Sequence, residues 1–264
     1  MRTPLQVRQL TAHCAPPWRD IRLVAETGST NTDVAVDANR GAARAWEVLV
    51  AEHQNAGRGR LDRDWTTTPG TALTFSALVP TPAEPGWVPL IAGLSVAEAV
   101  AELYAVRPAL KWPNDILAPV GSALEGAKVA GVLCELTGAG IVVGVGLNVD
   151  QEDGELPVPT ATSLRLLAQG HPPGLTRERL LLTILDHLAN RLAMWSQDPD
   201  QVRDAYRSGC VTIGQDVRVD LGQDRVQVAR AVGVDDTGRL VIESGAGRRP
   251  VAAGDVTHVR QDSP

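Results

Sequence analysis

The pattern of hydrophobic and polar positions divides the chain into two parts with different secondary structure. In the first part, apolar residues at helical spacing predict long helices over 88–104 and 176–196. Shorter helices are predicted at 31–39 and 199–208, and strands at 20–26, 46–52, 73–79, 129–136 and 141–149, with 46–52 expected to be buried. After residue 211 the pattern changes to short β-like runs at 215–221, 225–233, 239–243, 248–252 and 256–260. We therefore predict an α+β domain, a mixed sheet flanked by helices, followed by a small β-barrel.

Three segments follow from this pattern. Residues 1–19 carry three prolines and little periodicity, which indicates a loose arm or one short helix. Residues 20–209 form the predicted main domain, and residues 210–264 form the predicted small β domain. Ligand chemistry is therefore expected mainly on the loops and strand ends of 20–209.

Composition narrows the class of protein. Hydrophobic residues make up 44% and charged residues 21%, as in ordinary soluble domains, and the net charge of -6 gives no support to nucleic-acid binding. No run of about 18 apolar residues and no apolar leader is visible, so we expect a cytoplasmic protein without a membrane partner. The cysteines, Cys14, Cys134 and Cys210, are too few and too far apart for a disulfide framework or a zinc site.

A strong preference for arginine singles out two lysines. Of the 25 cationic residues, all are arginine except Lys111 and Lys128. Such a bias replaces lysine wherever arginine serves equally well, so these two positions are candidates for a compact ammonium group that a guanidinium cannot replace. Chance survival is the alternative for either lysine alone.

The first candidate site is the segment Gly57–Trp65, a glycine-containing loop with three arginines. Those arginines are Arg58, Arg60 and Arg63. Gly57 and Gly59 allow close approach of the backbone to a ligand, and clustered guanidinium groups suit phosphate or carboxylate. Trp65 could stack on an adenine ring. Taken alone, the segment could equally be a solvated basic turn.

Three further segments place polar residues or glycines at strand ends. The segment 111–115 (KWPND) offers a lysine for phosphate and a carboxylate that could hold magnesium or orient a lysine. The same residues are also typical of a simple Pro-Asn turn.

The segment Lys128–Glu135 puts a lysine at the mouth of an apolar strand, which is costly without an anionic partner. In that strand we interpret Cys134 as a packed thiol and Glu135 as a satisfied strand-end carboxylate. Gly144–Val149 has strand glycines that favour close ligand approach, and Asn148 could read an adenine edge.

Together these segments resemble the biotin–protein ligase family. The matching pieces are TGSTN at 27–31, AEHQNAGRGR at 51–60, KWPND at 111–115, KVAGVLCE at 128–135 and GVGLN at 144–148, in the family's order. The resemblance implies the class II synthetase-like catalytic fold of that family. The last 50 or so residues, ending in GDVTHVR at 254–260, resemble its small SH3-like C-terminal domain.

The resemblance also implies a two-step reaction, in which biotin and ATP with Mg²⁺ form biotinyl-5′-AMP and the biotinyl group then passes to a carrier lysine. It implies biotin contacts at Ser29, Thr30, Asn31, Gln54, Arg58, Gly59, Arg60, Lys128, Gly131, Gly144 and Gly146. Nucleotide contacts are implied at Arg60, Arg63, Trp65, Lys111, Asn114 and Asn148. The catalytic group would be Lys128, Arg58, Arg60, Lys111 and Asp115, with Asp115 the nearest group to assist deprotonation of the carrier lysine. Ser29, Thr30 and Asn31 serve equally well as helix caps.

The implied partners are biotin, ATP and the biotin carboxyl carrier domain of an acyl-CoA or pyruvate carboxylase, for a monomer or weak homodimer. The sequence assigns no protein ligands to a metal. Two departures stand out: Asp62 takes the place of a common glycine, and the 116–127 segment is longer than usual, which predicts a longer surface turn.

Three other functions are alternatives to a biotin ligase. A lipoate or octanoate ligase or transferase shares the fold, but the GRGR and KWPND pieces together favour biotin. A non-catalytic biotin-binding protein would not need both lysines and the arginine loop. A biotin-sensing repressor needs a DNA-binding helix-turn-helix of about 60 residues. Because Ser29 already belongs to the catalytic part, that domain and a DNA partner are not expected.

Overall fold

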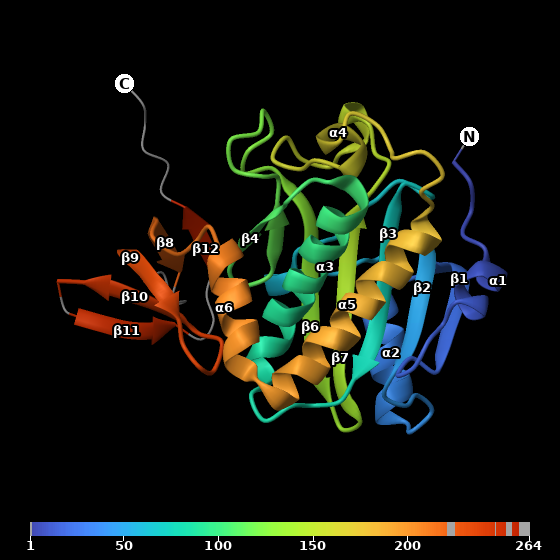
Figure 1. Ribbon diagram of the computed structural model, residues 1–264, viewed down its shortest axis with the longest axis horizontal. Coiled ribbons are helices and arrows are strands. Elements are labelled where there is room, and N and C mark those ends of the chain that lie inside the picture. The colour runs from blue at the N-terminus through green and yellow to red at the C-terminus, as the bar shows by residue number, and fades with distance from the viewer. Residues whose placement is uncertain (1, 221–224, 246, 252–254, 259–264) are drawn as a thin grey trace.

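A mixed seven-stranded sheet forms the centre of the computed structural model, which describes residues 2–220, 225–245, 247–251 and 255–258 (Figure 1). The strand order is β1-β2-β3-β7-β6-β5-β4. The strands are β1 (Asp20–Thr27), β2 (Glu47–Gln54), β3 (Ala72–Val79), β4 (Ala109–Lys111), β5 (Asp115–Leu117), β6 (Lys128–Thr137) and β7 (Gly140–Asn148). β1 and β2 run parallel and the other neighbouring strands antiparallel. Because most neighbouring strands are antiparallel, the loops that connect them lie at the two ends of the strands, where loops from different parts of the chain meet.

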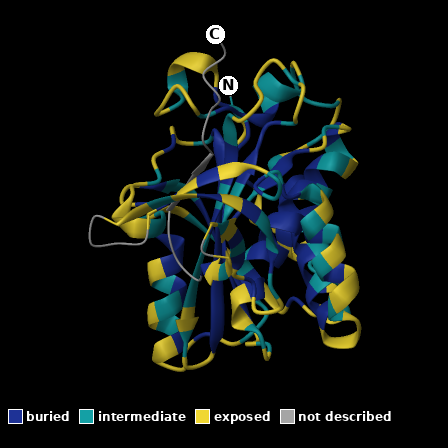
Figure 2. Ribbon diagram, turned by 90° about the vertical axis from the view of Figure 1, so that its left-hand side faces the viewer, coloured by how far each residue is buried: buried dark blue, intermediate teal, exposed yellow. Residues whose placement is uncertain are grey.

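Helices cover both faces of this sheet because its strands are apolar on both sides. Val48 and Val50 pack into the larger hydrophobic cluster, whereas Leu49 between them joins a second cluster with residues of α2 (Thr30–Asn39). The larger cluster also holds α3 (Val88–Tyr104), α5 (Arg177–Gln197) and α6 (Pro199–Gly209), with α3 and α5 crossing one face in Figure 1. Figure 2 shows the same division, with buried positions on the sheet and exposed ones on the outer sides of the helices.

One helical stretch of the described residues, Pro85–Tyr104, is long and apolar enough to cross a membrane, and 67% of its most apolar 18-residue window is buried. It contains α3, which packs against α5, α6 and the sheet. We therefore interpret its apolar character as that of a core helix.

The C-terminal part forms a second, five-stranded antiparallel sheet in the order β11-β10-β9-β8-β12. Its strands are β8 (Asp216–Asp220), β9 (Val226–Val234), β10 (Leu240–Ser244), β11 (Gly247–Val251) and β12 (Asp255–His258). Residues 221, 252, 259 and 260 of the predicted β runs, and parts of the GDVTHVR piece, lie outside the described residues. The turn between β9 and β10 rests on the main domain: Trp87 donates its indole N–H to Asp236 O (3.0 Å) and Trp112 to Gly238 O (3.0 Å). The predicted α+β class with a small β domain is confirmed.

The hydrophobic pattern does not predict two short elements, and for a third it leaves two alternatives. β5 has three residues and α4 (Leu164–Leu167) has four, too few for a period to emerge. In the N-terminal arm, the short-helix alternative is correct, as α1 spans Val7–Ala12. The long 116–127 segment forms β5 and then a turn closed by the bond from Ala118 N to Ala127 O (2.8 Å), with Val120 66% exposed.

Arg2 ties the start of the chain to the segment after β7: it donates to Asp150 (2.8 Å) and to both carboxylate oxygens of Glu155 (2.8 and 2.5 Å). The hydrogen bond from Arg2 lowers the pKa of Glu155 from 4.5 to about 2. A carboxylate whose folded-state pKa is depressed stabilises the fold above its unfolded pKa, and this contribution disappears as the pH falls toward the folded value.

We therefore expect Arg2→Ala to lower the free energy of unfolding at pH 7 by about 1 kcal/mol. The difference from wild type should shrink between pH 4.5 and pH 2, the two pKa values of Glu155. Denaturant titrations across that range measure both effects. Arg248→Ala, which breaks an exposed pair with Glu243 in the C-terminal sheet, is the control. A deficit for Arg2→Ala that stays constant with pH would contradict the linkage to Glu155.

Candidate active site

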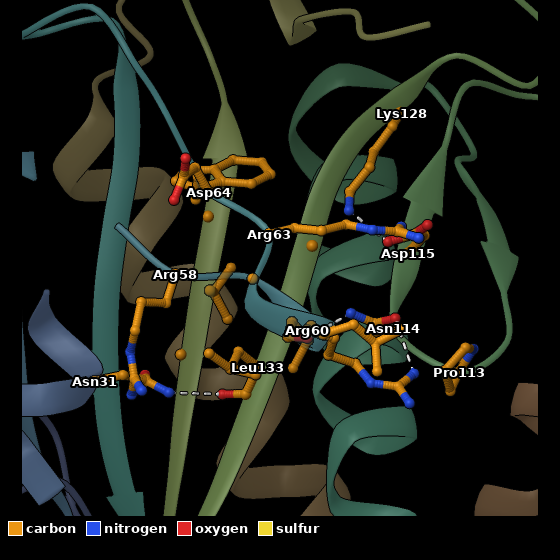
Figure 3. A pocket seen from close by; sticks show the side chains of 18 of the residues that line it. Asn31, Arg58, Arg60, Arg63, Asp64, Pro113, Asn114, Asp115, Lys128 and Leu133 are labelled. Atoms are coloured by element: carbon orange, nitrogen blue, oxygen red, sulfur yellow. Dashed lines mark hydrogen bonds and ion pairs between the residues drawn. The ribbon is translucent and has the colours of Figure 1, made fainter. Parts of the chain in front are cut away.

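A pocket of about 130 Å³ opens where the loop after β2, the β4–β5 turn and the strands β6 and β7 meet (Figure 3). It brings together most of the residues singled out from the sequence. These are Ser29, Asn31, Gln54, Arg58, Gly59, Arg60, Arg63, Trp65, Lys111, Asn114, Asp115, Lys128, Gly131, Gly144 and Gly146. Thr30 and Asn148 do not line it. The residues come from segments far apart in the chain, so the fold itself assembles the pocket.

The arginine loop is closed on itself by backbone hydrogen bonds, from Trp65 N to Gly57 O (2.8 Å) and from Gly59 N to Arg63 O (2.6 Å). Gly57 is required by this approach, since a Cβ there would lie 2.4 Å from Trp65 O. At the tip, Leu61 and Asp62 both have φ of 55°, the left-handed region that costs a residue with a side chain about 1 kcal/mol or more. Asp62, which takes the place of a glycine common in the family, thus adopts a backbone conformation that suits glycine.

Both lysines of the chain face one carboxylate. Asp115 Oδ1 lies 2.5 Å from Lys128 Nζ, and Asp115 Oδ2 lies 4.0 Å from Lys111 Nζ. β5 and β6 place Asp115 opposite Gly131, and Figure 3 shows Arg63 and Lys128 pointing toward this carboxylate. Asp115 therefore holds the lysines in place. Its predicted part in deprotonating the carrier lysine stays a prediction.

Trp65 covers the glycines of the strands beneath it. A Cβ on Gly146 would lie 2.3 Å from the indole ring, and one on Gly131 would lie 3.0 Å from Lys128 Nζ. Lys128 Nζ is 5.6 Å from the indole centroid, within the range of a cation–π contact. Trp65 Nε1 is buried and has no hydrogen-bond partner among the described residues. An unpaired donor at the pocket wall favours a ligand acceptor there.

The polar end of the pocket lies at the start of α2. Thr30 donates its backbone N–H (2.8 Å) and its hydroxyl (3.0 Å) to Gln54 Oε1, and Ser76 donates its hydroxyl to Asn31 Oδ1 (2.6 Å). Ser29 is the N-cap residue of α2, but its side chain makes no capping bond. All five side chains are buried, which is costly for polar groups unless they are hydrogen-bonded or bind a ligand.

The structure shows the surroundings of two further residues from the sequence analysis, Asn148 and Cys134. Asn148 is 3% exposed, donates to Thr162 O (3.0 Å) and accepts from Gln151 (3.0 Å), so these bonds hold it behind the pocket wall and its adenine contact stays a prediction. Burial raises the pKa of the Cys134 thiol, which fits a packed thiol rather than a nucleophile.

Glu135 is a pocket neighbour whose role sequence reasoning missed. The sequence predicts a satisfied strand-end carboxylate. In the structure Glu135 lies two residues from the end of β6, and its oxygens accept two hydrogen bonds from Arg58 Nη2 (both 2.7 Å). Its position two residues after Leu133 on the same strand is visible in the sequence, but its partner is 77 residues away. No local pattern connects the two.

Comparison with known families gives two matches. Residues 24–152 match the Biotin/lipoate A/B protein ligase family, and residues 212–259 match the Biotin protein ligase C terminal domain. The chain is 42% identical to the biotin–[acetyl-CoA-carboxylase] ligase of Mycobacterium tuberculosis over 98% of both chains. It is 29% identical to the bifunctional ligase/repressor BirA of Escherichia coli, covering 82% of this chain and 68% of that protein.

Solved structures give the same result. The biotin protein ligase from Aquifex aeolicus in complex with biotin and ATP superimposes with a TM-score of 0.77 at 26% identity, covering 92% of this chain and all of that one. The Leishmania major biotin protein ligase in complex with biotinyl-5-AMP gives a TM-score of 0.60, also at 26% identity, covering 90% of this chain and all of the other.

Proposed function

Because the chain belongs to the biotin protein ligase family, we propose that it activates biotin with ATP and transfers the biotinyl group to a lysine of a biotin carboxyl carrier domain. Full-length similarity to a biotin–[acetyl-CoA-carboxylase] ligase supports the activity, and ligase structures with biotin, ATP or biotinyl-5-AMP support the substrates. The observation from the structure that carries the proposal is the convergence of Arg58, Arg60, Arg63, Lys111 and Lys128 on one pocket with a glycine-lined wall.

In the first step, a biotin carboxylate oxygen attacks the α-phosphorus of ATP, and the bond from that phosphorus to pyrophosphate breaks. Both reactants are anions, so the barrier includes their repulsion. Lys128 and Lys111, held by Asp115, and the loop arginines Arg60 and Arg63 supply positive charge where the two anions meet. We assign Lys128 to the biotin carboxylate and the α-phosphate, and Lys111 to the phosphates.

In the second step, the uncharged amine of the carrier lysine attacks the acyl carbon and AMP leaves. A mixed anhydride hydrolyses in water, so a closed site protects it. Trp65 already covers Gly146 and Gly131, where we place the acyl chain, and must move to admit it. Gly131, Gly144 and Gly146 leave room for that chain because any Cβ would narrow the cleft.

ATP would enter as its Mg²⁺ complex, and the cation would offset part of the negative charge on the phosphates. Asn114 and Asp115 offer oxygen atoms at the phosphate end.

We further propose that the acceptor is a carrier domain of an acyl-CoA or pyruvate carboxylase. The working form would be a cytoplasmic monomer or weak homodimer. We propose that the chain divides into an N-terminal arm at 1–19, a catalytic domain at 20–209 and a small β domain at 210–264.

Pyrophosphate exchange tests the first step directly. Purified protein is incubated with ATP, Mg²⁺ and labelled pyrophosphate together with biotin, lipoate, octanoate or no acid. We expect label in ATP with biotin alone. Exchange with lipoate or octanoate and none with biotin would overturn the choice of acid, and no exchange with any of the three would overturn the adenylation step.

A further inference from the structure

We propose that Glu135 is a positioning residue for biotin: it fixes Arg58 and Asn31 at the ring end of the pocket and assigns Arg58 to biotin rather than to ATP. The inference rests on the proposed function and deepens it. The family resemblance implies a biotin contact for Arg58, and the contacts of Arg58 and Arg60 give a structural reason for distinguishing these two arginines.

Glu135 directs the Arg58 side chain through an ion pair. Its Nη2 lies 2.7 Å from Oε1 and 2.7 Å from Oε2 of the carboxylate. The Glu135 side chain is 31% exposed and that of Arg58 47%, and ion pairs this accessible to water add little to stability. The consequence of this pair is therefore mainly geometric, since it holds a long and otherwise rotatable side chain in one direction.

The same carboxylate orients Asn31. The Asn31 amide donates to Glu135 Oε2 (2.8 Å) and to Leu133 O (3.1 Å), and its oxygen accepts from Ser76 (2.6 Å). With both amide hydrogens directed at acceptors, the amide can adopt a single orientation. Asn31 is 4% exposed and Ser76 is fully buried, so a disturbed bond would not be replaced easily by water.

These bonds continue to the residues assigned to the biotin ring. The Ser76 hydroxyl lies 2.7 Å from the Thr30 hydroxyl, and Thr30 in turn donates to Gln54 Oε1. A continuous path of polar contacts thus runs from Arg58 through Glu135 and Asn31 to Gln54. Figure 3 shows Arg58 pointing to the Asn31 end of the pocket, away from Lys128 and Asp115.

Arg60 lies at the opposite side of this arrangement, where its Nη1 is 3.4 Å from Asn114 Oδ1. Glu135 neutralises Arg58 and would repel a phosphate brought close to it. The positive charge of Arg58 therefore lies at the biotin-ring end of the pocket, whereas the other loop arginines and both lysines lie near the phosphate end. Loss of Glu135 should therefore affect the use of biotin more than that of ATP.

The test is Glu135→Gln, with biotin and ATP varied separately in pyrophosphate exchange. Loss of a charged acceptor is expected to raise the KM for biotin about tenfold. The KM for ATP should change by less than about twofold, because no bond to the phosphate end is removed. Glu135→Asp keeps the charge on a shorter side chain and should rescue part of the loss. Glu243→Gln breaks an exposed Arg–Glu pair in the C-terminal sheet and should match wild type.

An unchanged biotin KM in Glu135→Gln, or equal rises in both KM values, would overturn the proposal. If that variant does not fold, the Glu135→Asp enzyme decides instead: a raised biotin KM with an unchanged ATP KM supports the positioning role, and wild-type values for both oppose it. Wild-type protein without biotin-dependent exchange would refute the proposed function, a result distinct from either of these.

Discussion

Lys128→Ala is expected to lower kcat/KM for biotinylation of a carrier domain by about 10²–10³-fold. Lys128 Nζ lies at the mouth of β6 beside Asp115, in the pocket that we assign to the biotin carboxylate and the α-phosphate. Removing it leaves two reacting anions without the cation between them. It also leaves the Asp115 carboxylate with its other lysine 4.0 Å away, so the site gains uncompensated negative charge.

Lys128→Arg should recover little of this loss, although it keeps the charge. The ammonium fits within 2.5 Å of Asp115 and against the Trp65 ring, and a planar guanidinium is larger and has a different donor geometry. Arg179→Ala, which removes an exposed cation from α5 outside the pocket, is the control and should retain wild-type kinetics. Initial rates of carrier biotinylation compare the variants. A Lys128→Ala enzyme that works at the wild-type rate would show that the role assigned to this lysine is wrong.

Gly144→Ala is expected to raise the KM for biotin about tenfold or more, by forcing Asn31 out of its bonds. A Cβ at this position would lie 2.0 Å from Asn31 Oδ1, and both groups are enclosed by the sheet and α2. The amide must shift, and its bonds to Ser76, Leu133 and Glu135 then break together. Isothermal titration with biotin, alongside the exchange assay, measures the effect.

Gly138→Ala is the matched control, because a Cβ in that β6–β7 turn meets nothing within 4 Å. It should bind biotin as wild type does. If Gly144→Ala also retains wild-type biotin affinity while remaining folded, then Asn31 is not part of the biotin site, and the polar end of the pocket has another role.

Periodicity was sufficient to predict the main helices and most strands, because each is long enough to show one face of apolar side chains. The 88–104 prediction matches α3 residue for residue, and 73–79 is within one residue of β3. Three-residue β5 carries no period, and its pairing with β6 depends on contacts that no short window contains. The order of strands in the sheet is likewise a property of long-range packing.

The site was predictable in its residue types but not in its internal bonds. Glycines and cations in a few short segments indicated an anion pocket, and the structure brings most of them together. The pairing of Glu135 with Arg58 joins a strand to a distant loop and leaves no local trace. For Asn148 the sequence indicates a residue type suited to an adenine edge, but the bonds that hold it to Thr162 and Gln151 come from other segments and could not be predicted.

The central claim is transfer of biotin to a carrier lysine, and intact-mass spectrometry of the acceptor tests it most directly. A purified biotin carboxyl carrier domain is incubated with the protein, biotin, ATP and Mg²⁺, with a second sample of the carrier in which the acceptor lysine is replaced by arginine. We predict the added mass of one biotinyl group on the wild-type carrier and none on the lysine-to-arginine carrier. A wild-type carrier that keeps its original mass, in a reaction where a known biotin protein ligase modifies it, would contradict the account.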